Sequence, residues 1–221
     1  MNEELKQQIK RIADDIGYVS CGITTAEPFE RFESGVRERL AQFPETHPLY
    51  ENMLQRVDPQ RTTPWARSIV VCVRRYGKYR LPPEPVGHIG RNYLADRRLK
   101  ACPDYAMPRE MTAALRDLGL KVKRGGTPDR VAAARAGAAQ ILRNGFAYHE
   151  DAGSWLNIST WRVDAALAPD DPTFECPCPE NCQACMQQCP TAAITAPYIM
   201  RMDKCIAYLT YHAPEPVPEE L

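Results

Sequence analysis

Apolar residues near the start of the chain recur with helical spacing. Across residues 2–16 they are three or four positions apart, which places them on one face of a helix: Leu5, Ile9, Ile12 and Ile16. Asn2 is a suitable N-cap, because its side chain can accept a free backbone N–H group, and Gly17 is a suitable stop. The pattern therefore predicts an amphipathic helix over residues 2–16.

Runs of β-branched residues predict the strands of a sheet. The clearest is residues 68–74 (SIVVCVR), whose apolar pattern is typical of a strand at the buried centre of a sheet. Shorter strands are predicted at residues 19–24, 120–124 and 155–163. Helices are predicted at residues 26–40, 108–118 and 128–143, with long connections, rich in proline and polar residues, at 44–66 and 77–107.

The order of these elements predicts the fold class. Strands interleave with helices up to about residue 165, which indicates a mixed α/β (α+β) domain over residues 1–165. A cysteine-rich segment follows, and we expect a ferredoxin-like module over residues 170–221. A last helix is predicted from Asp203, as its cap, to Tyr211.

Composition limits the classes of function. The 221 residues have a formal net charge of zero, so the chain lacks the basic field of a dedicated nucleic-acid binder. Its apolar runs fall short of the roughly 20 residues that span a bilayer, so no membrane partner is expected. The polar first residues are unlike a signal peptide. These features predict a cytoplasmic protein.

The distribution of cysteines points to a metal site. Six of the nine cysteines fall within residues 176–205, in a chain with no export signal, which favours metal binding over a disulfide framework. The core of the run has the spacing C-x3-C-x2-C-x3-C-P, close to the C-x2-C-x2-C-x3-C-P of bacterial ferredoxins. It predicts an iron–sulfur site, most simply a [4Fe–4S] cluster, on four residues: Cys178, Cys182, Cys185 and Cys189.

The ligand set remains open at the level of sequence. In two-cluster ferredoxins the cysteine before proline binds the other cluster, so Cys189 and Cys205 would belong to a second site. Either one cluster completes its set locally, with Cys189, Cys205 or Cys176 as the fourth ligand, or the chain is part of a two-cluster protein. A structural zinc site is the weaker alternative, because zinc knuckles are separated by longer spacers.

Several motifs resemble those of one known family. They are Arg135-Ala-Gly137, Arg143-Asn144, Gly153-Ser-Trp155, Cys189-Pro-Thr-Ala-Ala-Ile194 and Cys205-Ile-Ala-Tyr-Leu-Thr210. Over nearly its whole length the chain resembles the epoxyqueuosine reductase family, whose members use cobalamin and two [4Fe–4S] clusters and are related in fold to reductive dehalogenases. In that family a second C-x2-C motif follows a segment like residues 218–221, so the resemblance predicts a divergent, shortened member.

The resemblance implies a function and a set of site residues. Electrons would pass from the cluster to cobalamin and then to a substrate, either a small molecule or a tRNA-derived group. A ferredoxin or flavodoxin would be the electron donor. The cofactor-facing motifs imply that cobalamin contacts four residues: Arg143, Asn144, Gly153 and Ser154.

The family's proton-donating aspartate has two candidate counterparts. An ungapped comparison places Lys123 at its position, and Asp129 lies six residues further on, so both are candidate catalytic residues. Glycines of the family are replaced by Ala138, Ala139 and Leu142. Two other functions stay open: an electron-transfer or corrinoid-handling module without catalysis, and a zinc-stabilised binding module.

Overall fold

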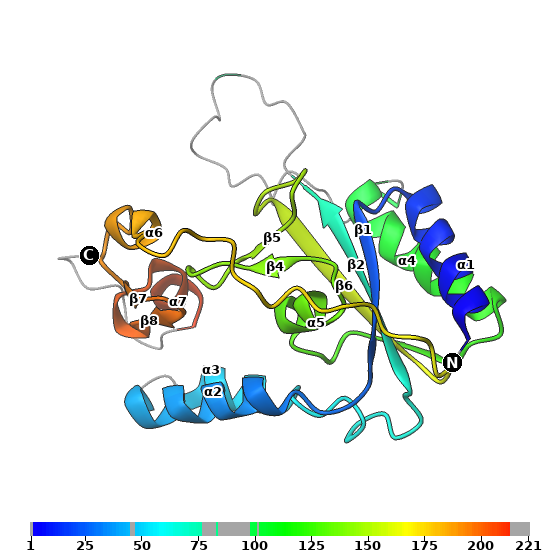
Figure 1. Cartoon of the computed structure of the whole chain (residues 1–221), viewed down its shortest axis with the longest axis horizontal. Helices are drawn as coiled ribbons and strands as arrows, with labels where there is room; N and C mark the ends of the chain where they lie inside the picture. Colours follow the sequence, from blue (N-terminus) through cyan, green and yellow to red (C-terminus); the bar gives the residue numbers. More distant parts are fainter. Residues whose placement is uncertain (1, 45–46, 77–82, 84–97, 101, 213–221) are drawn as a thin grey trace.

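The computed structural model describes residues 2–44, 47–76, 83, 98–100 and 102–212. At its centre is a sheet with the strand order β1-β2-β6-β3, in which each strand is antiparallel to its neighbours. Figure 1 shows three of its strands crossing the middle of the molecule: β1 (Ser20–Thr25), β2 (Ser68–Arg75) and β6 (Leu156–Val163). The short strand β3 (Val122–Arg124) lies at the edge next to β6. The predicted mixture of helices and strands is confirmed.

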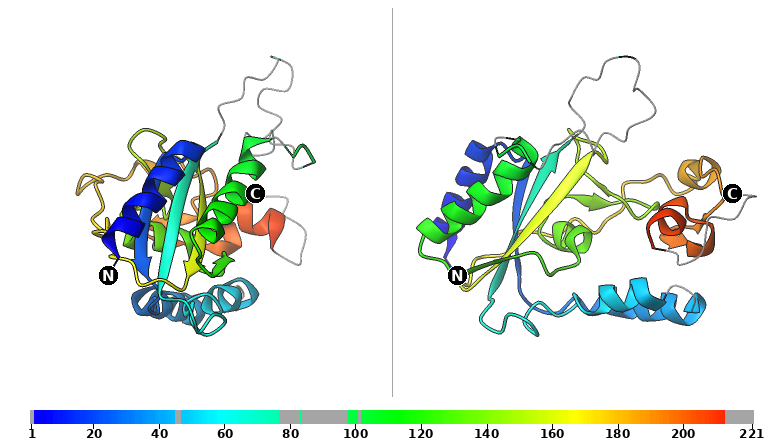
Figure 2. Two further views of the ribbon diagram at one scale, coloured as in Figure 1. Left: turned by 90° about the vertical axis from the view of Figure 1, so that its right-hand side faces the viewer. Right: turned by 180° about the vertical axis from the view of Figure 1, so that it is seen from behind.

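Two helices cover one face of this sheet, as Figure 2 shows: α1 (Glu3–Ile16) and α4 (Pro103–Asp117). Alternate side chains of a strand point to opposite faces. Val70 and Trp161 therefore point to this side, where they are fully buried against Ile9 and Met111. Burial of large apolar side chains supplies the main driving force for this layer.

The first helix begins and ends as the sequence predicts. The Asn2 side chain accepts the N–H of Leu5 at 2.9 Å, and Gly17 adopts a φ of 99° that glycine tolerates best. The helix therefore begins at Glu3, directly after the predicted cap, and stops at the expected glycine.

A short helix, α5 (Asp129–Arg135), packs against the other face of the sheet. Its buried alanines allow a close approach: Ala132, Ala133 and Ala134. At Gly22 of β1 an added Cβ would lie 2.0 Å from the Ala136 carbonyl oxygen, so only glycine fits there. The close packing fixes α5 over β1, β2 and β6.

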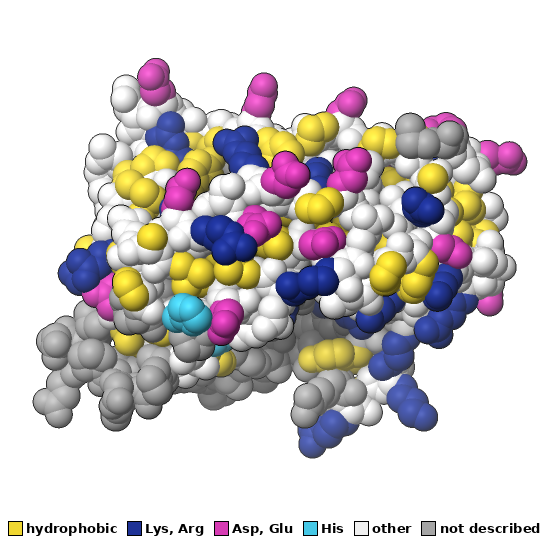
Figure 3. Space-filling view, turned by 90° about the horizontal axis from the view of Figure 1, so that it is seen from below, with side chains coloured by type: hydrophobic (Ala, Val, Ile, Leu, Met, Phe, Trp, Pro, Cys, Tyr) yellow, Lys and Arg dark blue, Asp and Glu magenta, His cyan; other side chains and the backbone are white. Residues whose placement is uncertain are grey.

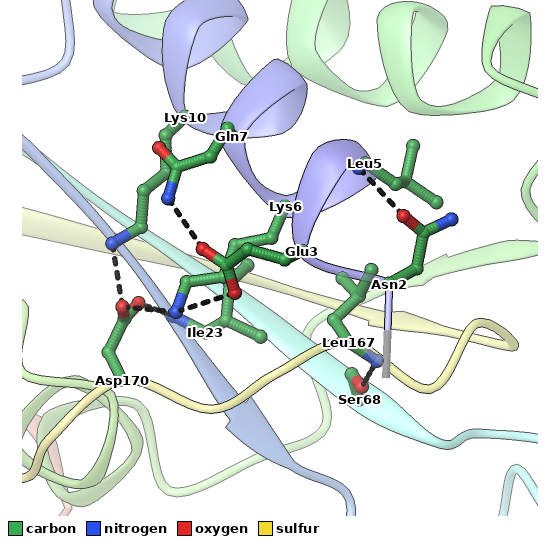
Figure 4. A network of polar contacts seen from close by, with 10 residues as sticks. All are labelled: Asn2, Glu3, Leu5, Lys6, Gln7, Lys10, Ile23, Ser68, Leu167 and Asp170. Carbon is green, nitrogen blue, oxygen red and sulfur yellow. Dashed lines mark hydrogen bonds and ion pairs between the residues drawn. The ribbon is translucent and has the colours of Figure 1, made fainter.

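The segment that leads to the cysteines is fastened to the first helix and to the sheet (Figure 4). Asp170 Oδ1 lies 2.8 Å from Lys6 Nζ and 2.7 Å from Lys10 Nζ, and Asp170 Oδ2 accepts the N–H of Ile23 at 2.8 Å. The Leu167 N–H donates to Ser68 Oγ at 2.9 Å. These contacts set where the cysteine-rich segment starts.

The cysteine-rich segment packs against two helices that extend from the sheet, α2 (Glu30–Gln42) and α3 (His47–Leu54). Four buried side chains join these parts: Val36, Tyr50, Met202 and Tyr208. The segment contains α6 (Ala184–Gln187), β7 (Ile194–Ala196), β8 (Ile199–Met200), η3 (Met202–Lys204) and α7 (Ile206–Tyr211). Its likeness to a ferredoxin stays a prediction.

One predicted helix is too long. Residues 128–143 are helical only to Arg135, because Gly137 turns the chain with a φ of 66°. An added Cβ at Gly137 would lie 2.5 Å from the Asp171 carbonyl oxygen, so the turn is fixed by close packing. The chain then forms a hairpin of β4 (Gln140–Ile141) and β5 (Ala147–Tyr148).

Three further expectations need correction or lie outside the described residues. The predicted connection 44–66 contains α3. Asp203 does not cap a single last helix: its carboxylate pairs with Arg201 Nε at 2.9 Å, and Cys205 separates η3 from α7. Most of the predicted connection 77–107 lies outside the described residues, and its end forms the first turn of α4. Among the described helices none is both long and apolar enough to cross a membrane.

Candidate active site and cysteine centre

Three adjoining cavities form a groove between α2, α3, α5 and the cysteine-rich segment. Their volumes are about 310, 440 and 400 Å³, and Phe32 and Val131 line all three. Each falls within the size range of small-molecule sites, and the shared lining residues show that the three cavities adjoin. We call this feature the central groove.

One end of the central groove contains Asp129, in the first turn of α5. Asp129 Oδ1 lies 3.0 Å from Thr127 Oγ1 and 3.1 Å from Thr160 Oγ1, and the two hydroxyl oxygens are 2.8 Å apart. Burial raises the pKa of the Asp129 carboxyl, and the two hydroxyls offset only part of that rise. The hydroxyls of Thr127 and Thr160 have only two protons for these three contacts. A protonated Asp129 carboxyl can supply the proton for the third hydrogen bond. Burial and this additional hydrogen bond both favour the protonated form of the Asp129 carboxyl.

Lys123 lies elsewhere on the same side of the sheet. It is on the edge strand β3, opposite Arg162, and its exposed side chain reaches the Thr62 carbonyl oxygen at 3.4 Å. It does not line any of the three cavities of the central groove. The structure therefore separates the two candidate catalytic residues, and only Asp129 faces the groove.

Arg143 connects the other end of the central groove to the cysteines. Its Nη1 donates to the carbonyl oxygens of Glu180 at 2.7 Å and Cys182 at 3.2 Å. Its carbonyl oxygen accepts the N–H of Tyr198 at 2.7 Å. Arg143 thus holds the loop between Cys178 and Cys182 against the β4–β5 hairpin.

Tyr198 is a site residue that sequence reasoning missed. Its φ of 63° is unusual for a residue with a side chain, and such strained positions gather at functional sites. Arg39 Nη2 donates to its carbonyl oxygen at 2.8 Å. Burial and the neighbouring Cys176 raise the pKa of the Tyr198 hydroxyl to about 12, so it stays a proton donor. The Pro197-Tyr198 turn between two short strands was the only signal in the sequence.

The thiols of Cys176, Cys178 and Cys182 lie close enough to affect one another. Burial raises the pKa of the Cys176 thiol, but the Tyr198 hydroxyl and Cys178 outweigh it and lower that pKa. The backbone N–H of Arg143 lowers the pKa of the Cys178 thiol. Burial and the neighbouring Cys176 outweigh this effect, so the pKa is raised overall. The spare candidate Cys176 therefore stands beside two of the predicted ligands.

The remaining predicted ligands are placed separately. Cys185 lies within α6. Cys189 Sγ accepts the Ala193 N–H at 3.3 Å. Burial raises the pKa of this thiol, but hydrogen bonds from backbone N–H groups outweigh burial and lower the pKa overall. Cys205 packs against the hydrophobic core that contains Val36 and Met202. All six thiols of the segment are free and only half-buried.

The donor set of the segment consists of thiols, which are the ligands that an iron–sulfur cluster uses. In the described part of the chain, no group of three or more His, Cys, Asp or Glu side chains converges as the ligands of one metal ion would. A multi-iron cluster is ligated by thiolates alone, each bound to a different iron, whereas zinc gathers its ligands around one centre. Six free thiols in one segment fit the cluster.

The other predicted cofactor residues lie in or next to the β4–β5 hairpin. Asn144 Nδ2 donates to the Tyr148 hydroxyl at 2.8 Å, and Asn144 Oδ1 accepts the N–H of Phe146 at 3.0 Å. Gly153, with a φ of 55°, pairs with His149 in the following turn. Ser154 is exposed, and its carbonyl oxygen accepts the Leu156 N–H at 2.9 Å. Of these, Asn144 lines the central groove together with Arg143.

The walls of the central groove combine apolar side chains with arginines. Arg31, Gly35 and Arg39 recur every four residues along one face of α2, a signal that the sequence carried and that sequence reasoning missed. Four further arginines line the groove: Arg56, Arg130, Arg135 and Arg143. Ala138 and Ala139, which replace glycines of the resembled family, are buried in the core instead.

Comparisons with known proteins show relatives over nearly the whole chain. It is 30% identical over 220 residues to the epoxyqueuosine reductase of Staphylococcus aureus, covering 94% of this chain and 57% of that protein. It is 26% identical over 236 residues to that of Cellulophaga algicola, covering 99% of this chain and 72% of that protein. Over nearly its whole length the chain is similar to epoxyqueuosine reductases. No protein-family model matches it.

Solved structures of epoxyqueuosine reductases share this fold. One, determined with an epoxyqueuosine-modified stem loop of tRNA-Tyr, has a TM-score of 0.74 and 25% identity, covering 98% of this chain and 60% of that chain. The epoxyqueuosine reductase of Streptococcus thermophilus has a TM-score of 0.79. A reductive dehalogenase of B12-dependent chemistry shares the fold with a TM-score of 0.51, which confirms the predicted relation. The chain spans little more than half the length of the Staphylococcus aureus relative.

Proposed function

We propose that this chain is a member of the epoxyqueuosine reductase-like family and takes part in a corrinoid-dependent reduction in the central groove, with electrons entering through a [4Fe–4S] cluster. The single observation that supports this most is the groove itself. It joins the Asp129 carboxyl, a proton source, to Arg143 and Tyr198, which contact the cysteine loop. A reductive site needs a source of electrons and a source of protons on either side of the reacting group.

We assign the cluster to the cysteine-rich segment, with Cys178, Cys182 and Cys185 as the first ligands. Cys176 is the nearest reserve ligand, because its thiol lies beside Cys178. Cys189 and Cys205 remain candidates for the fourth position or for a second cluster. Arg143 holds the Cys178–Cys182 loop in place by its contacts with two carbonyl oxygens, one of them that of Cys182.

We assign the corrinoid to the central groove. Apolar side chains in the middle and arginines along α2 suit a large flat macrocycle whose edge carries polar amide groups and a phosphate. When bound, the cluster supplies single electrons and the corrinoid supplies a strongly reducing metal centre. Phe32 and Val131 would contact its face, and Arg143 and Asn144 would orient its edge.

We assign proton donation to Asp129. Its carboxyl faces the groove, and its raised pKa keeps a proton available for transfer nearer to neutral pH than an ordinary aspartate does. Lys123 stays a prediction without this support, because its amino group is exposed and bound to the Thr62 carbonyl oxygen. The proton would pass from the Asp129 carboxyl to the reduced substrate, and Thr127 and Thr160 hold the carboxylate that remains.

The substrate class follows the relatives. One relative was solved with an epoxyqueuosine-modified tRNA stem loop, so a tRNA-derived epoxide is the substrate that we propose to test first. A ferredoxin or flavodoxin is the proposed electron donor. We also propose that residues 1–165 form the corrinoid domain and residues 170–221 the cluster module, with the Asp170 contacts at their junction.

Turnover of a defined substrate tests this function. The chain is reconstituted with iron and sulfide without oxygen, loaded with cobalamin, reduced with a flavodoxin system and given an epoxyqueuosine-containing stem loop. Formation of the reduced nucleoside, measured by mass spectrometry, is the expected result. Cobalamin binding without turnover would support the electron-transfer or corrinoid-handling alternative, and zinc in place of iron in the purified protein would support the zinc module.

A further inference from the structure

Two cysteines outside the cysteine-rich segment face each other across the sheet. Cys21 of β1 and Cys72 of β2 are direct partners in the antiparallel register. Their Sγ atoms lie 3.6 Å apart, with the Cys72 thiol donating to that of Cys21. Two thiols of one chain, 51 residues apart in sequence, are thus held in contact by the fold rather than by local sequence.

The two thiols differ in their access to solvent. Cys72 is fully buried, and burial raises the pKa of its thiol well above the ordinary value. Cys21 is half-buried at the edge of the same core cluster, so a small solute can reach it. A reagent from solution therefore meets Cys21 first, and Cys72 is reached only through Cys21.

One polar side chain, that of Tyr18, lies next to this cysteine pair on the buried side of the sheet. The Tyr18 hydroxyl is buried beside Cys72 and finds no hydrogen-bond partner in the part of the chain that the structure describes. Its ring packs edge-on against Trp161, at a centroid distance of 6.2 Å. This group lies on the face covered by α1 and α4, opposite the face where α5 and the central groove lie.

We propose that Cys21 and Cys72 form a reversible disulfide between β1 and β2, a modification site separate from the cluster ligands. Directly paired residues of antiparallel strands have Cα atoms about 4.5–5.5 Å apart, within the range that disulfides span. Their Cβ atoms are about 4.5–5.5 Å apart, at or beyond the upper end of the disulfide range. The bond therefore needs the strands to draw together slightly, which makes it readily reducible.

The oxidant is a small disulfide such as oxidised glutathione. The Cys21 thiolate attacks one of its sulfurs, forming a mixed disulfide and releasing one glutathione thiolate. The Cys72 thiol then loses its proton and attacks the Cys21 sulfur, releasing the second glutathione thiolate. The cysteine pair loses two electrons and two protons, and oxidised glutathione takes them up to become two molecules of reduced glutathione.

Peptide mapping of the intact, cluster-loaded protein tests the proposal. The protein is incubated without oxygen with oxidised glutathione, free thiols are alkylated at acidic pH, and the chain is cut with trypsin. A cross-linked species that joins residues 12–31 to residues 68–74 is expected, and dithiothreitol should remove it. Cys102→Ser is the matched control, because Cys102 is also half-buried but lies at the start of α4.

The variants separate the possible outcomes. Cys21→Ser should lose the cross-link and leave Cys72 unmodified until the protein is denatured, whereas Cys102→Ser should form the cross-link as the natural chain does. Stable glutathionylation of Cys21 without a cross-link would overturn the proposal, as would the absence of any modification at Cys21. The second outcome would leave the pair as small core residues.

Discussion

At the scale of single residues, the clearest chemical feature is a carboxyl whose pKa is raised by burial. Asp129 shares its contacts with the hydroxyls of Thr127 and Thr160, both of which are almost fully buried. An ungapped family comparison put Lys123 at the position of the aspartate, with Asp129 six residues further on. Such a comparison cannot say which side chain faces a cavity. The fold places only Asp129, and not Lys123, in the lining of the groove.

Replacing Asp129 by Asn separates its chemical role from its structural role. Asn keeps the size of the side chain and can accept from either threonine, so the melting temperature should hold or rise. Turnover should fall by about 100-fold or more, because the proton is no longer supplied. Thr127→Ser is a conservative control, since it keeps the hydroxyl. Full activity of the Asn variant would contradict the assignment.

The same residue gives a pH dependence of stability. A carboxyl with a raised pKa in the folded protein stabilises the fold at low pH. That contribution fades as pH rises from about 4, the value for an unfolded chain, through the higher folded value. Denaturation of the natural chain and of Asp129→Asn should therefore diverge across this range, with the natural chain losing relative stability. A constant difference at all pH values would show that the pKa is not raised.

Arg143 is predicted to stabilise the iron–sulfur cluster because it holds the backbone of the loop between Cys178 and Cys182. Arg143→Met keeps much of the side-chain length but removes the donors to Glu180 and Cys182, so iron and sulfide per reconstituted chain should fall. Arg37→Met is the control, because Arg37 is an exposed residue whose ion pair with Glu33 contributes about 0–1 kcal/mol at most. Equal iron content in both variants would refute this role.

At the scale of elements, the sequence located the four strands of the central sheet better than it located the ends of helices, and it missed the short strands β4, β5, β7 and β8. The β-branched run of β2 and the stripe of α1 are signals within single elements, so they could be read directly. The end of α5 could not, because Gly137 is required by the carbonyl oxygen of Asp171, far along the chain. The helix α3 and the placement of Tyr198 depend in the same way on contacts between distant segments.

The contacts of Asp170 join elements that are distant in sequence, and they make a prediction about stability. Asp170→Asn leaves the largely buried Lys6 without its closest counter-charge, so the free energy of unfolding should fall by about 2 kcal/mol. Burial raises the pKa of the Asp170 carboxyl, but Lys10 and Lys6 outweigh it and lower that pKa. The stabilisation is therefore present above about pH 4 and lost as pH falls through the lower folded value.

Urea denaturation of both forms measures this effect. The difference between the natural chain and Asp170→Asn should be constant near neutral pH and shrink in acid. Glu33→Gln serves as a control, because its ion pair with Arg37 is exposed and local to one helix. A loss of stability for Asp170→Asn no larger than that of the control would show that the junction contributes little.

At the scale of the whole molecule, the net charge could be known from composition, whereas the groove depends on how the chain packs. Acidic and basic side chains lie among apolar ones over most of the face in Figure 3, with several Lys and Arg side chains gathered toward its lower right. The net charge of the chain is zero. The groove arginines therefore matter as local donors and not as part of a broad basic field. Composition could exclude classes of partner, but only the packing of α2 and α3 against the cysteine-rich segment forms the groove.

Cobalamin binding to a chain with a blocked groove tests the central claim most directly. Gly35 lies in the groove with no atom within 4 Å of an added Cβ, so Gly35→Trp should fill the groove without disturbing α2, and Gly35→Ala is the matched control. The natural chain and Gly35→Ala should show the same cobalamin titration by absorbance, and Gly35→Trp should bind at least about tenfold more weakly. Equal binding by all three would place the corrinoid elsewhere, and absence of binding by the natural chain would contradict a corrinoid site.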